Sequence, residues 1–344
     1  MHSKLFETDE LAALGGSLQR LPWHVLPLPD EALVSWCGRL AERLGWSVAA
    51  LARDGFGIQG RLKSDWWVRP SVSHLHQMAA RSGVAVETLR RMSFLNWAGP
   101  VRDDEASERF AGWRYESQSP AERGRGLAVC TQCLAGDAVP YLRLTWLVGW
   151  STVCESHGTV LHTKCRRCWQ SLRVASPASK AAFTADHCVR CAADLKGFPS
   201  VAASLPVKAL QDALLVGKRT GATALPGIGP LTWSEVITLV DVLVGAIWEQ
   251  MSLDDLFPFL ERVAQTLGMD GRSGFAFLKD RLGSLALAAW LLEDWPRNLL
   301  STPIRDLAMR WIGGEPKRIP TQIGPAREEV CGTRLHNLLS NLKA

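Results

Sequence analysis

Eight residues between positions 130 and 191 have the types and the spacing that bind metal ions. They form four pairs, and in each pair two residues separate the two ligand-type side chains. Such a turn brings two ligand atoms to one tetrahedral ion, and a second turn farther along the chain completes a set of four ligands. The pairs are Cys130 and Cys133, Cys154 and His157, Cys165 and Cys168, and Cys188 and Cys191.

The order of these pairs predicts two separate sites, of the kind found in zinc ribbons and treble clefs. The first two pairs would hold one ion and the last two pairs another. Because each set has four protein ligands, no position is left for a water or a substrate, and we expect two structural zinc ions. Two alternatives stay open. The first and third pairs could share an ion, or His162 or His187 could replace His157.

A short internal repeat precedes the cysteine-rich segment. Residues 40–56 and 78–94 are identical at seven of 17 positions. Each copy is predicted to form a helix, a turn at Gly45 or Gly83 and a second helix, which is the helix-turn-helix pattern. In such motifs, the outward residues at the start of the second helix contact DNA. A contact of the same residues with a protein partner is equally consistent with the sequence. The candidate contacts are Ser47, Arg53, Thr88, Arg90 and Arg91.

Three further arginines lie in the predicted metal-binding segment. Arg143 is flanked by Tyr141, Leu144 and Trp146, and we expect it to point outward while its neighbours pack a small core. Arg166 and Arg167 separate two predicted ligands. All three arginines are candidates for contacts with DNA phosphates or with a partner, and a purely solvated surface is the alternative.

These elements predict a mainly α, multi-domain protein. Prolines near the start disfavour helix, the stretch after position 100 is polar, and amphipathic helical patterns dominate after position 205. The predicted parts are an extended leader (1–29), a helix-turn-helix domain (30–100), a linker (101–126), a small β-containing tandem zinc-ribbon module (127–200) and a C-terminal helical domain (201–344).

Composition and absent motifs exclude several function classes. The formal charge of +5 permits a nucleic-acid partner without requiring one. No Gly-x4-Gly-Lys-Ser/Thr or Gly-x-Ser-x-Gly run occurs, which argues against an ATPase and against a serine hydrolase. A zinc hydrolase would need an open site with a base such as Glu155 or Asp186, but both predicted ligand sets are full. We therefore expect no enzymatic activity.

The sequence also favours a cytoplasmic protein without a membrane partner. No signal peptide is recognisable, and the longest apolar stretches are too short to cross a bilayer. In a reducing compartment, paired cysteines indicate a metal site before they indicate a disulfide.

Three segments resemble the TniQ family of transposon-encoded targeting proteins. Residues 28–36 resemble its opening P-x-P-x-E-S-L-x-S-W segment, and residues 130–146 resemble its C-P-x-C-L…P-Y-x-R-x-x-W segment. Residues 153–168 resemble C-x-x-H-x-x-x-L…C-P-x-C. Thr131 and Arg166 stand where the family usually has proline, which removes no ligand.

The resemblance implies a non-catalytic adaptor of DNA transposition. Such proteins link a target-site recogniser, either DNA or an RNA-guided CRISPR effector complex, to the AAA+ ATPase and transposase of the transposon. Some of them act as homodimers. The alternative is a sequence-specific DNA-binding transcriptional regulator with structural zinc.

Overall fold

The computed structural model describes residues 20–59, 70–96, 127–173, 184–233, 235–237, 239–240, 243, 253–266, 281–295 and 297–300. Most of the predicted leader, the whole predicted linker and residues 301–344 lie outside these ranges. No helix in the described ranges is both long enough and apolar enough to span a membrane.

The N-terminal part consists of two helix-turn-helix units, as the internal repeat predicts. In the first, the chain turns at Gly45, and in the second it turns at Gly83; both glycines have positive φ angles, of 68° and 75°. Ser47 and Ser71 cap following helices by accepting hydrogen bonds of 3.1 Å from Ala50 N and His74 N. The elements are α1 (Leu33–Arg43), α2 (Val48–Ala50), the π-helix η1 (Leu51–Gly55), α3 (Val72–Ser82), α4 (Val86–Arg91) and the 3₁₀ helix η2 (Phe94–Asn96).

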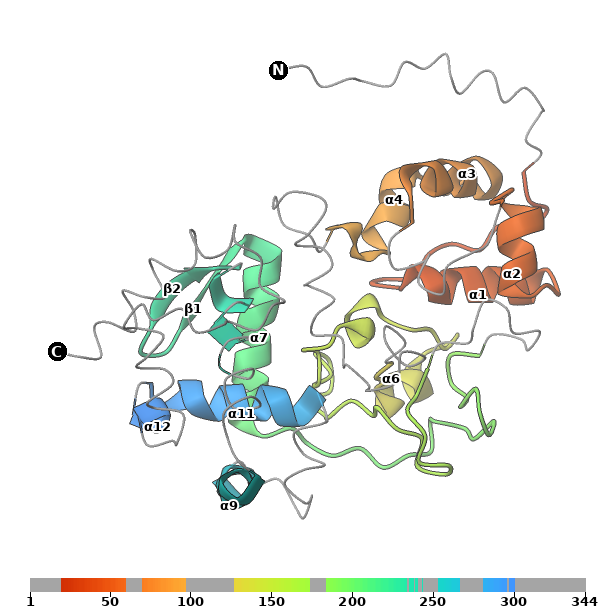
Figure 1. Ribbon diagram of the computed structural model, residues 1–344. Coiled ribbons are helices and arrows are strands. Elements are labelled where there is room, and N and C mark those ends of the chain that lie inside the picture. Colours follow the sequence, from red (N-terminus) through yellow and green to blue (C-terminus); the bar gives the residue numbers. More distant parts are fainter. Residues whose placement is uncertain are drawn as a thin grey trace, which may run out of the picture.

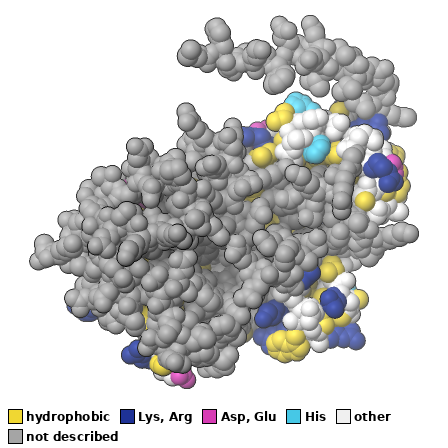
Figure 2. Space-filling model, in the orientation of Figure 1, with side chains coloured by type: hydrophobic (Ala, Val, Ile, Leu, Met, Phe, Trp, Pro, Cys, Tyr) yellow, Lys and Arg dark blue, Asp and Glu magenta, His cyan; other side chains and the backbone are white. Residues whose placement is uncertain are grey.

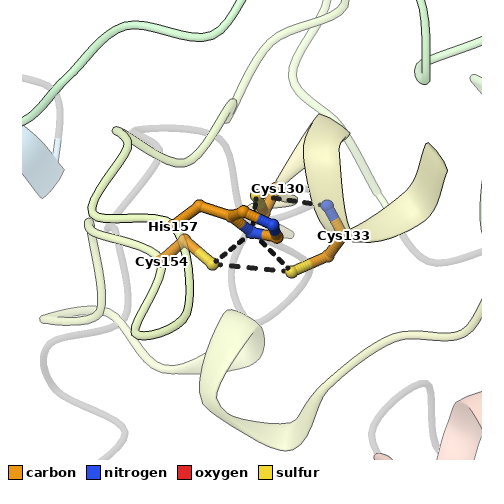
Figure 3. A group of neighbouring side chains, drawn as sticks. All are labelled: Cys130, Cys133, Cys154 and His157. Atoms are coloured by element: carbon orange, nitrogen blue, oxygen red, sulfur yellow. Dashed lines mark hydrogen bonds between the residues drawn. The ribbon is translucent and has the colours of Figure 1, made fainter. Parts of the chain in front are cut away.

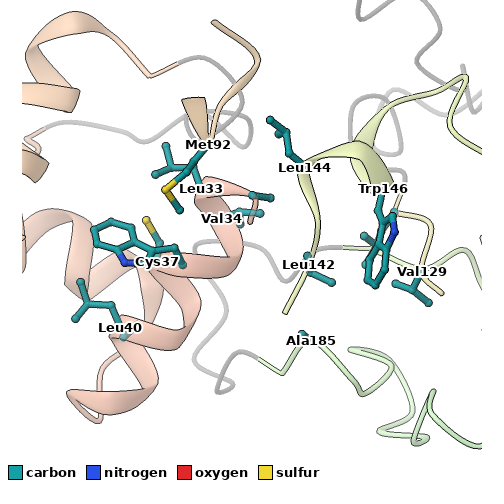
Figure 4. Close-up of a cluster of buried hydrophobic side chains, with 14 of the residues drawn as sticks. Leu33, Val34, Cys37, Leu40, Met92, Val129, Leu142, Leu144, Trp146 and Ala185 are labelled. Atoms are coloured by element: carbon teal, nitrogen blue, oxygen red, sulfur yellow. The ribbon is translucent and has the colours of Figure 1, made fainter. Parts of the chain in front are cut away.

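The helical units and the cysteine-rich segment share one hydrophobic core. Leu33 and Met92 belong to the same cluster of buried side chains as Val129, Leu142 and Trp146. Figure 4 shows side chains of both parts in this cluster. The helical units are therefore fixed to the cysteine-rich segment by apolar packing.

Backbone hydrogen bonds join the same two parts. The amide of Ala32 donates to Leu142 O at 2.9 Å, and the amide of Leu144 donates to Asp30 O at 2.8 Å. The hydroxyl of Ser35 accepts from Leu142 N at 3.0 Å. Two of the three segments that resemble the TniQ family thus lie side by side.

A buried carboxylate supports this junction. The side chain of Glu31 is 0% exposed, and Arg39 donates to both of its oxygens, at 2.8 and 2.6 Å. Ser35 Oγ and Leu28 N also donate to it, at 2.8 and 3.0 Å. The buried charge is therefore paired and hydrogen-bonded, as burial of a carboxylate requires.

The C-terminal part has its own core, to which helix α7 contributes Val207, Leu210, Leu214 and Leu215. Figure 1 shows α7 between the β-hairpin and the cysteine-rich segment, with α11 running across its lower end. Two antiparallel strands pair Ala222 with Thr232 and Leu225 with Gly229. The elements are α7 (Leu205–Thr220), β1 (Ala222–Leu225), β2 (Gly229–Thr232), α9 (Leu253–Thr266), α11 (Arg281–Glu293) and α12 (Arg297–Leu300).

The cysteine-rich segment contains β-bridges, but no regular strand in its described residues. In the described residues, the expected zinc-ribbon module contains the short helix α6 (Thr131–Gly136) and the 3₁₀ helix η3 (Leu144–Leu147). It also contains isolated β-bridges, such as the one between Val129 and His162. The regular strands follow α7, within the part predicted to be a C-terminal helical domain (201–344). The mainly helical class is confirmed, and the two-stranded sheet is a further element in the C-terminal part.

One buried glutamine connects α7 to the cysteine-rich segment. Gln211 Oε1 accepts from Thr152 N at 2.6 Å and from Val153 N at 2.8 Å, and its Nε2 donates to Val153 O at 2.5 Å. Gln211 is 1% exposed. Val153 immediately precedes a predicted ligand, so this side chain positions that ligand's backbone.

We expect Gln211→Leu to lower the free energy of unfolding by about 2–4 kcal/mol, because it leaves buried backbone groups of Thr152 and Val153 without partners. Chemical denaturation monitored by circular dichroism measures the change. Gln59→Leu, at an exposed position, is the matched control and should change stability by less than about 0.5 kcal/mol. Equal effects of the two substitutions would contradict the assignment.

Candidate metal centres

The first cluster brings together the first two predicted ligand pairs. Cys130 lies at the N-cap of α6, where its Sγ accepts from Cys133 N at 3.5 Å. Cys133 Sγ lies 3.5 Å from Cys154 Sγ. The Nδ1 atom of His157 lies 3.5 Å from Cys130 Sγ, 3.2 Å from Cys133 Sγ and 3.5 Å from Cys154 Sγ. In Figure 3 the four side chains point toward one another.

The second cluster brings together the last two pairs. Cys165 Sγ lies 3.6 Å from Cys191 Sγ, and Cys168 Sγ lies 3.9 Å from Cys188 Sγ. In each cluster all four ligand atoms lie within 4.8 Å of one another. Every described cysteine is free. The sequential arrangement of pairs is therefore the observed one, and the interleaved arrangement is not.

The separations of the ligand atoms fit tetrahedral coordination. With Zn–S bonds of about 2.3 Å and Zn–N bonds of about 2.0–2.1 Å, a tetrahedron places two sulfurs about 3.8 Å apart and a sulfur and a nitrogen about 3.6 Å apart. The measured separations of 3.2–3.9 Å lie close to these values. Both clusters can hold one metal ion, with all four positions taken by protein atoms.

Three of the four metal-binding turns have the same backbone structure. In each, the residue after the second ligand donates its N–H to the carbonyl oxygen of the first ligand at 2.8 Å. This residue is Gly158, Trp169 or Ala192, with φ angles of 62°, 57° and 54°. Glycine adopts such angles without strain, but alanine and tryptophan do not. Two of the turns therefore contain a strained residue.

The cysteine pKa values show which thiols lose their protons readily. Burial raises the pKa of Cys165, but the backbone N–H groups of Cys168 and Arg167 stabilise its thiolate and bring the pKa to about 7. The pKa of Cys130 is lowered because Cys133 and Cys154 donate hydrogen bonds to its sulfur. A metal ion that replaces the shared protons would bind all these sulfurs as thiolates.

The alternative histidine ligands and the acidic neighbours have other partners. His162 Nε2 lies 3.1 Å from Pro199 O, and His187 Nδ1 lies 2.8 Å from Asp186 Oδ1. Asp186 also accepts from Lys196 Nζ at 2.6 Å. Glu155 accepts from Arg219 Nη2, at 2.5 Å. The two histidines therefore lie outside both clusters. Glu155 and Asp186, the candidate bases of a zinc hydrolase, form ion pairs.

Of the candidate contacts of the helix-turn-helix units, Arg53, Arg90 and Arg91 are exposed and Ser47 and Thr88 are half-buried. Two of the three arginines are paired with acids. Arg53 binds Asp54 through two 2.8 Å hydrogen bonds, and Arg90 binds Glu87 at 3.0 Å. Arg91 Nη2 lies 3.5 Å from Thr88 Oγ1. The side chain of Ser47 caps α2. The roles of these five residues in binding DNA or a partner stay predictions.

Arg143 does not point outward as the sequence suggested. Its guanidinium donates to both oxygens of Asp137, at 2.6 and 2.7 Å, and lies over the rings of Tyr141 and Trp146. Only 17% of its side chain is exposed. The outward placement was wrong because Asp137, at the end of α6, comes within reach of the guanidinium in the folded chain. Its contact role stays a prediction.

Sequence reasoning missed Gln211 and Trp169. A lone glutamine in an amphipathic helix gives no sequence signal of a tertiary role. Trp169 could have been found, because the glycine after His157 marks a backbone position that needs a positive φ, and Trp169 holds the equivalent position after Cys168. A bulky residue at such a position is uncommon and indicates a special role.

One region of the chain matches a known protein family. Residues 22–161 match the TniQ family, which confirms the resemblance seen in the sequence. The matched region contains both helix-turn-helix units and the first cluster, and it ends before the second cluster. A search of the curated proteins found no match to the chain.

We expect Cys130→Ser and Cys188→Ser each to reduce the metal content from two ions per chain to one, since each removes a ligand from a different cluster. Inductively coupled plasma mass spectrometry of the purified chains measures this content. Cys37→Ser is the control, because the Cys37 thiol is buried in α1 and its burial raises its pKa. A chain that keeps both ions after either cluster substitution would contradict the ligand set.

Because three metal-binding turns share one backbone structure, we expect two substitutions at equivalent positions to change the free energy of unfolding in opposite directions. Gly158→Ala should lower the free energy of unfolding by about 1 kcal/mol, because alanine is strained at a φ of 62°. Ala192→Gly should raise it by about 0.5 kcal/mol, because the relief of strain exceeds the entropic cost of glycine. Thermal and chemical denaturation of the metal-loaded chains measure both. The same sign for both substitutions would argue against equivalent turns.

Proposed function

We propose that this protein, whose residues 22–161 match the TniQ family, is a non-catalytic adaptor of DNA transposition. In this proposal it links a target-site recogniser, which is DNA or an RNA-guided complex, to an AAA+ ATPase and its transposase. The observation that carries the proposal is the family match over the region that contains both helix-turn-helix units and the first cluster. Within that region, the described residues of the helix-turn-helix units and of the cysteine-rich segment share a core and backbone hydrogen bonds.

The metal that we propose for both clusters is zinc. Three thiolates with one imidazole, or four thiolates, are ligand sets typical of structural zinc, and the near-tetrahedral separations agree with them. Bound zinc would contribute folding free energy on the order of 10 kcal/mol per site. Its role here is to hold turns in place, since both ligand sets are full.

The charge pattern on the helix-turn-helix units favours an adaptor over a regulator that binds DNA by itself. A recognition helix that binds DNA alone needs free cations for phosphates and base edges. Two arginines of these units are instead paired with Asp54 and Glu87. Such mixed-charge surfaces suit a protein partner, with DNA binding shared across an assembly.

The proposal predicts direct association with the AAA+ ATPase encoded beside this protein. We expect the tagged, full-length chain to retain that ATPase in a pull-down, with retention increased by ATP and target DNA. The ATPase of an unrelated transposon is the matched control. Absence of association under every condition, together with a tight complex between this protein alone and one operator sequence, would favour the regulator instead.

A charge reversal then tests the helix-turn-helix surface. Arg91→Glu, on exposed α4, should weaken retention of the ATPase or DNA at least fivefold, as loss of an interface contact does. Arg297→Glu, on α12 of the C-terminal part, is the control and should leave retention unchanged.

A further inference from the structure

The outer face of the second cluster carries an exposed aromatic ring among basic side chains. We call this the outer face and define it by Lys164, Arg166, Arg167, Trp169, Val189 and Arg190. Trp169 is 70% exposed and Val189 is 50% exposed. Figure 2 shows basic side chains around hydrophobic ones at the lower right of the molecule, where Figure 1 draws the cysteine-rich segment.

Folding does not account for the tryptophan on this face. Trp169 has a φ angle of 57°, which is strained for a bulky side chain, and its ring lies in solvent. Glycine would fit the same turn, as Gly158 does in the equivalent position. A strained residue that gains little burial is typical of a functional surface.

The cations on the outer face have no acidic partners among the described residues. Arg166, Arg167 and Arg190 lie between the ligands of the second cluster, and all three are exposed. The nearby carboxylates of Asp186 and Asp194 instead bind Lys196. A zinc ion with four thiolates would carry a net charge of −2, which the four basic residues of this face exceed.

We propose that the outer face binds nucleic acid at an unstacked base. Trp169 stacks on the base, and the arginines on both sides of it bind the flanking phosphates. An aromatic platform within a basic surface is the arrangement that binds single strands. An acidic protein segment would use the cations but would gain little from a flat indole standing in solvent. The inference deepens the proposed function, because it names nucleic acid as a ligand of this chain.

Fluorescence anisotropy with a labelled single-stranded DNA of 20 nucleotides tests the tryptophan. Trp169→Gly should weaken binding about tenfold, as loss of one base–aromatic stack does. The same substitution should leave the metal content unchanged and the melting temperature equal or higher, since it relieves strain. Trp23→Ala removes a partly exposed tryptophan of the N-terminal part; it is the control and should not change the affinity.

A salt series tests the arginines. For the single strand, replacing Arg166, Arg167 and Arg190 by alanine should reduce the slope of log K against log salt by about 2. Replacing Arg219 and Arg297, which bind Glu155 and Asp294, should not change it. A fully paired duplex of the same sequence should bind less tightly than the strand and should lose less affinity on Trp169→Gly.

Two results would overturn the proposal. One is single-strand binding that is the same for the wild type, Trp169→Gly and the triple-arginine variant. The other is equally tight binding of poly-glutamate with no effect of Trp169→Gly on either ligand, which would assign the face to acidic proteins. These measurements contain no ATPase. A negative result for the outer face is therefore separate from a negative result in the ATPase pull-down.

Discussion

The fold depends on the approach of four ligand atoms at each of two points in the cysteine-rich segment. In its described residues this segment has little regular secondary structure, and turns and isolated bridges fix most of its backbone. Three of those turns are built around ligands and repeat one hydrogen-bonded structure. A metal ion in each cluster would hold these turns together more strongly than the small apolar core could, since ligation free energy becomes folding free energy.

The other parts of the protein are attached to this segment at defined points. The helix-turn-helix units join it through the backbone pairing of Ala32 with Leu142 and through the buried carboxylate of Glu31. The C-terminal part joins it through Gln211, which binds the backbone just before Cys154. Its core also includes Trp150 and Val153. In the proposed adaptor, the helix-turn-helix units and the C-terminal part are thus both anchored to the segment that carries the two clusters.

Local rules made the ligands and the helix turns predictable from sequence. A pair of ligands two residues apart, or a glycine after a helix, has the same structural meaning in any protein, and the structure places these residues as expected. The hairpin at 222–232 was missed because its turn, Leu225-Pro226-Gly227, reads equally well as a break between helices. The partner of Arg143 and the role of Gln211 depend on residues brought together only by folding. The DNA or protein contacts of Ser47, Arg53, Thr88, Arg90, Arg91, Arg166 and Arg167 depend on a second molecule, so the sequence pattern marks these residues only as candidates.

X-ray absorption at the zinc edge reports which atoms surround the metal in the intact protein, so it measures the proposed ligand sets without any substitution. We expect two four-coordinate zinc ions per chain, with seven sulfurs and one nitrogen shared between them, Zn–S distances of about 2.3 Å and no coordinated water. A spectrum with oxygen ligands, with fewer sulfurs, or from a fully folded protein that contains no zinc would contradict this expectation.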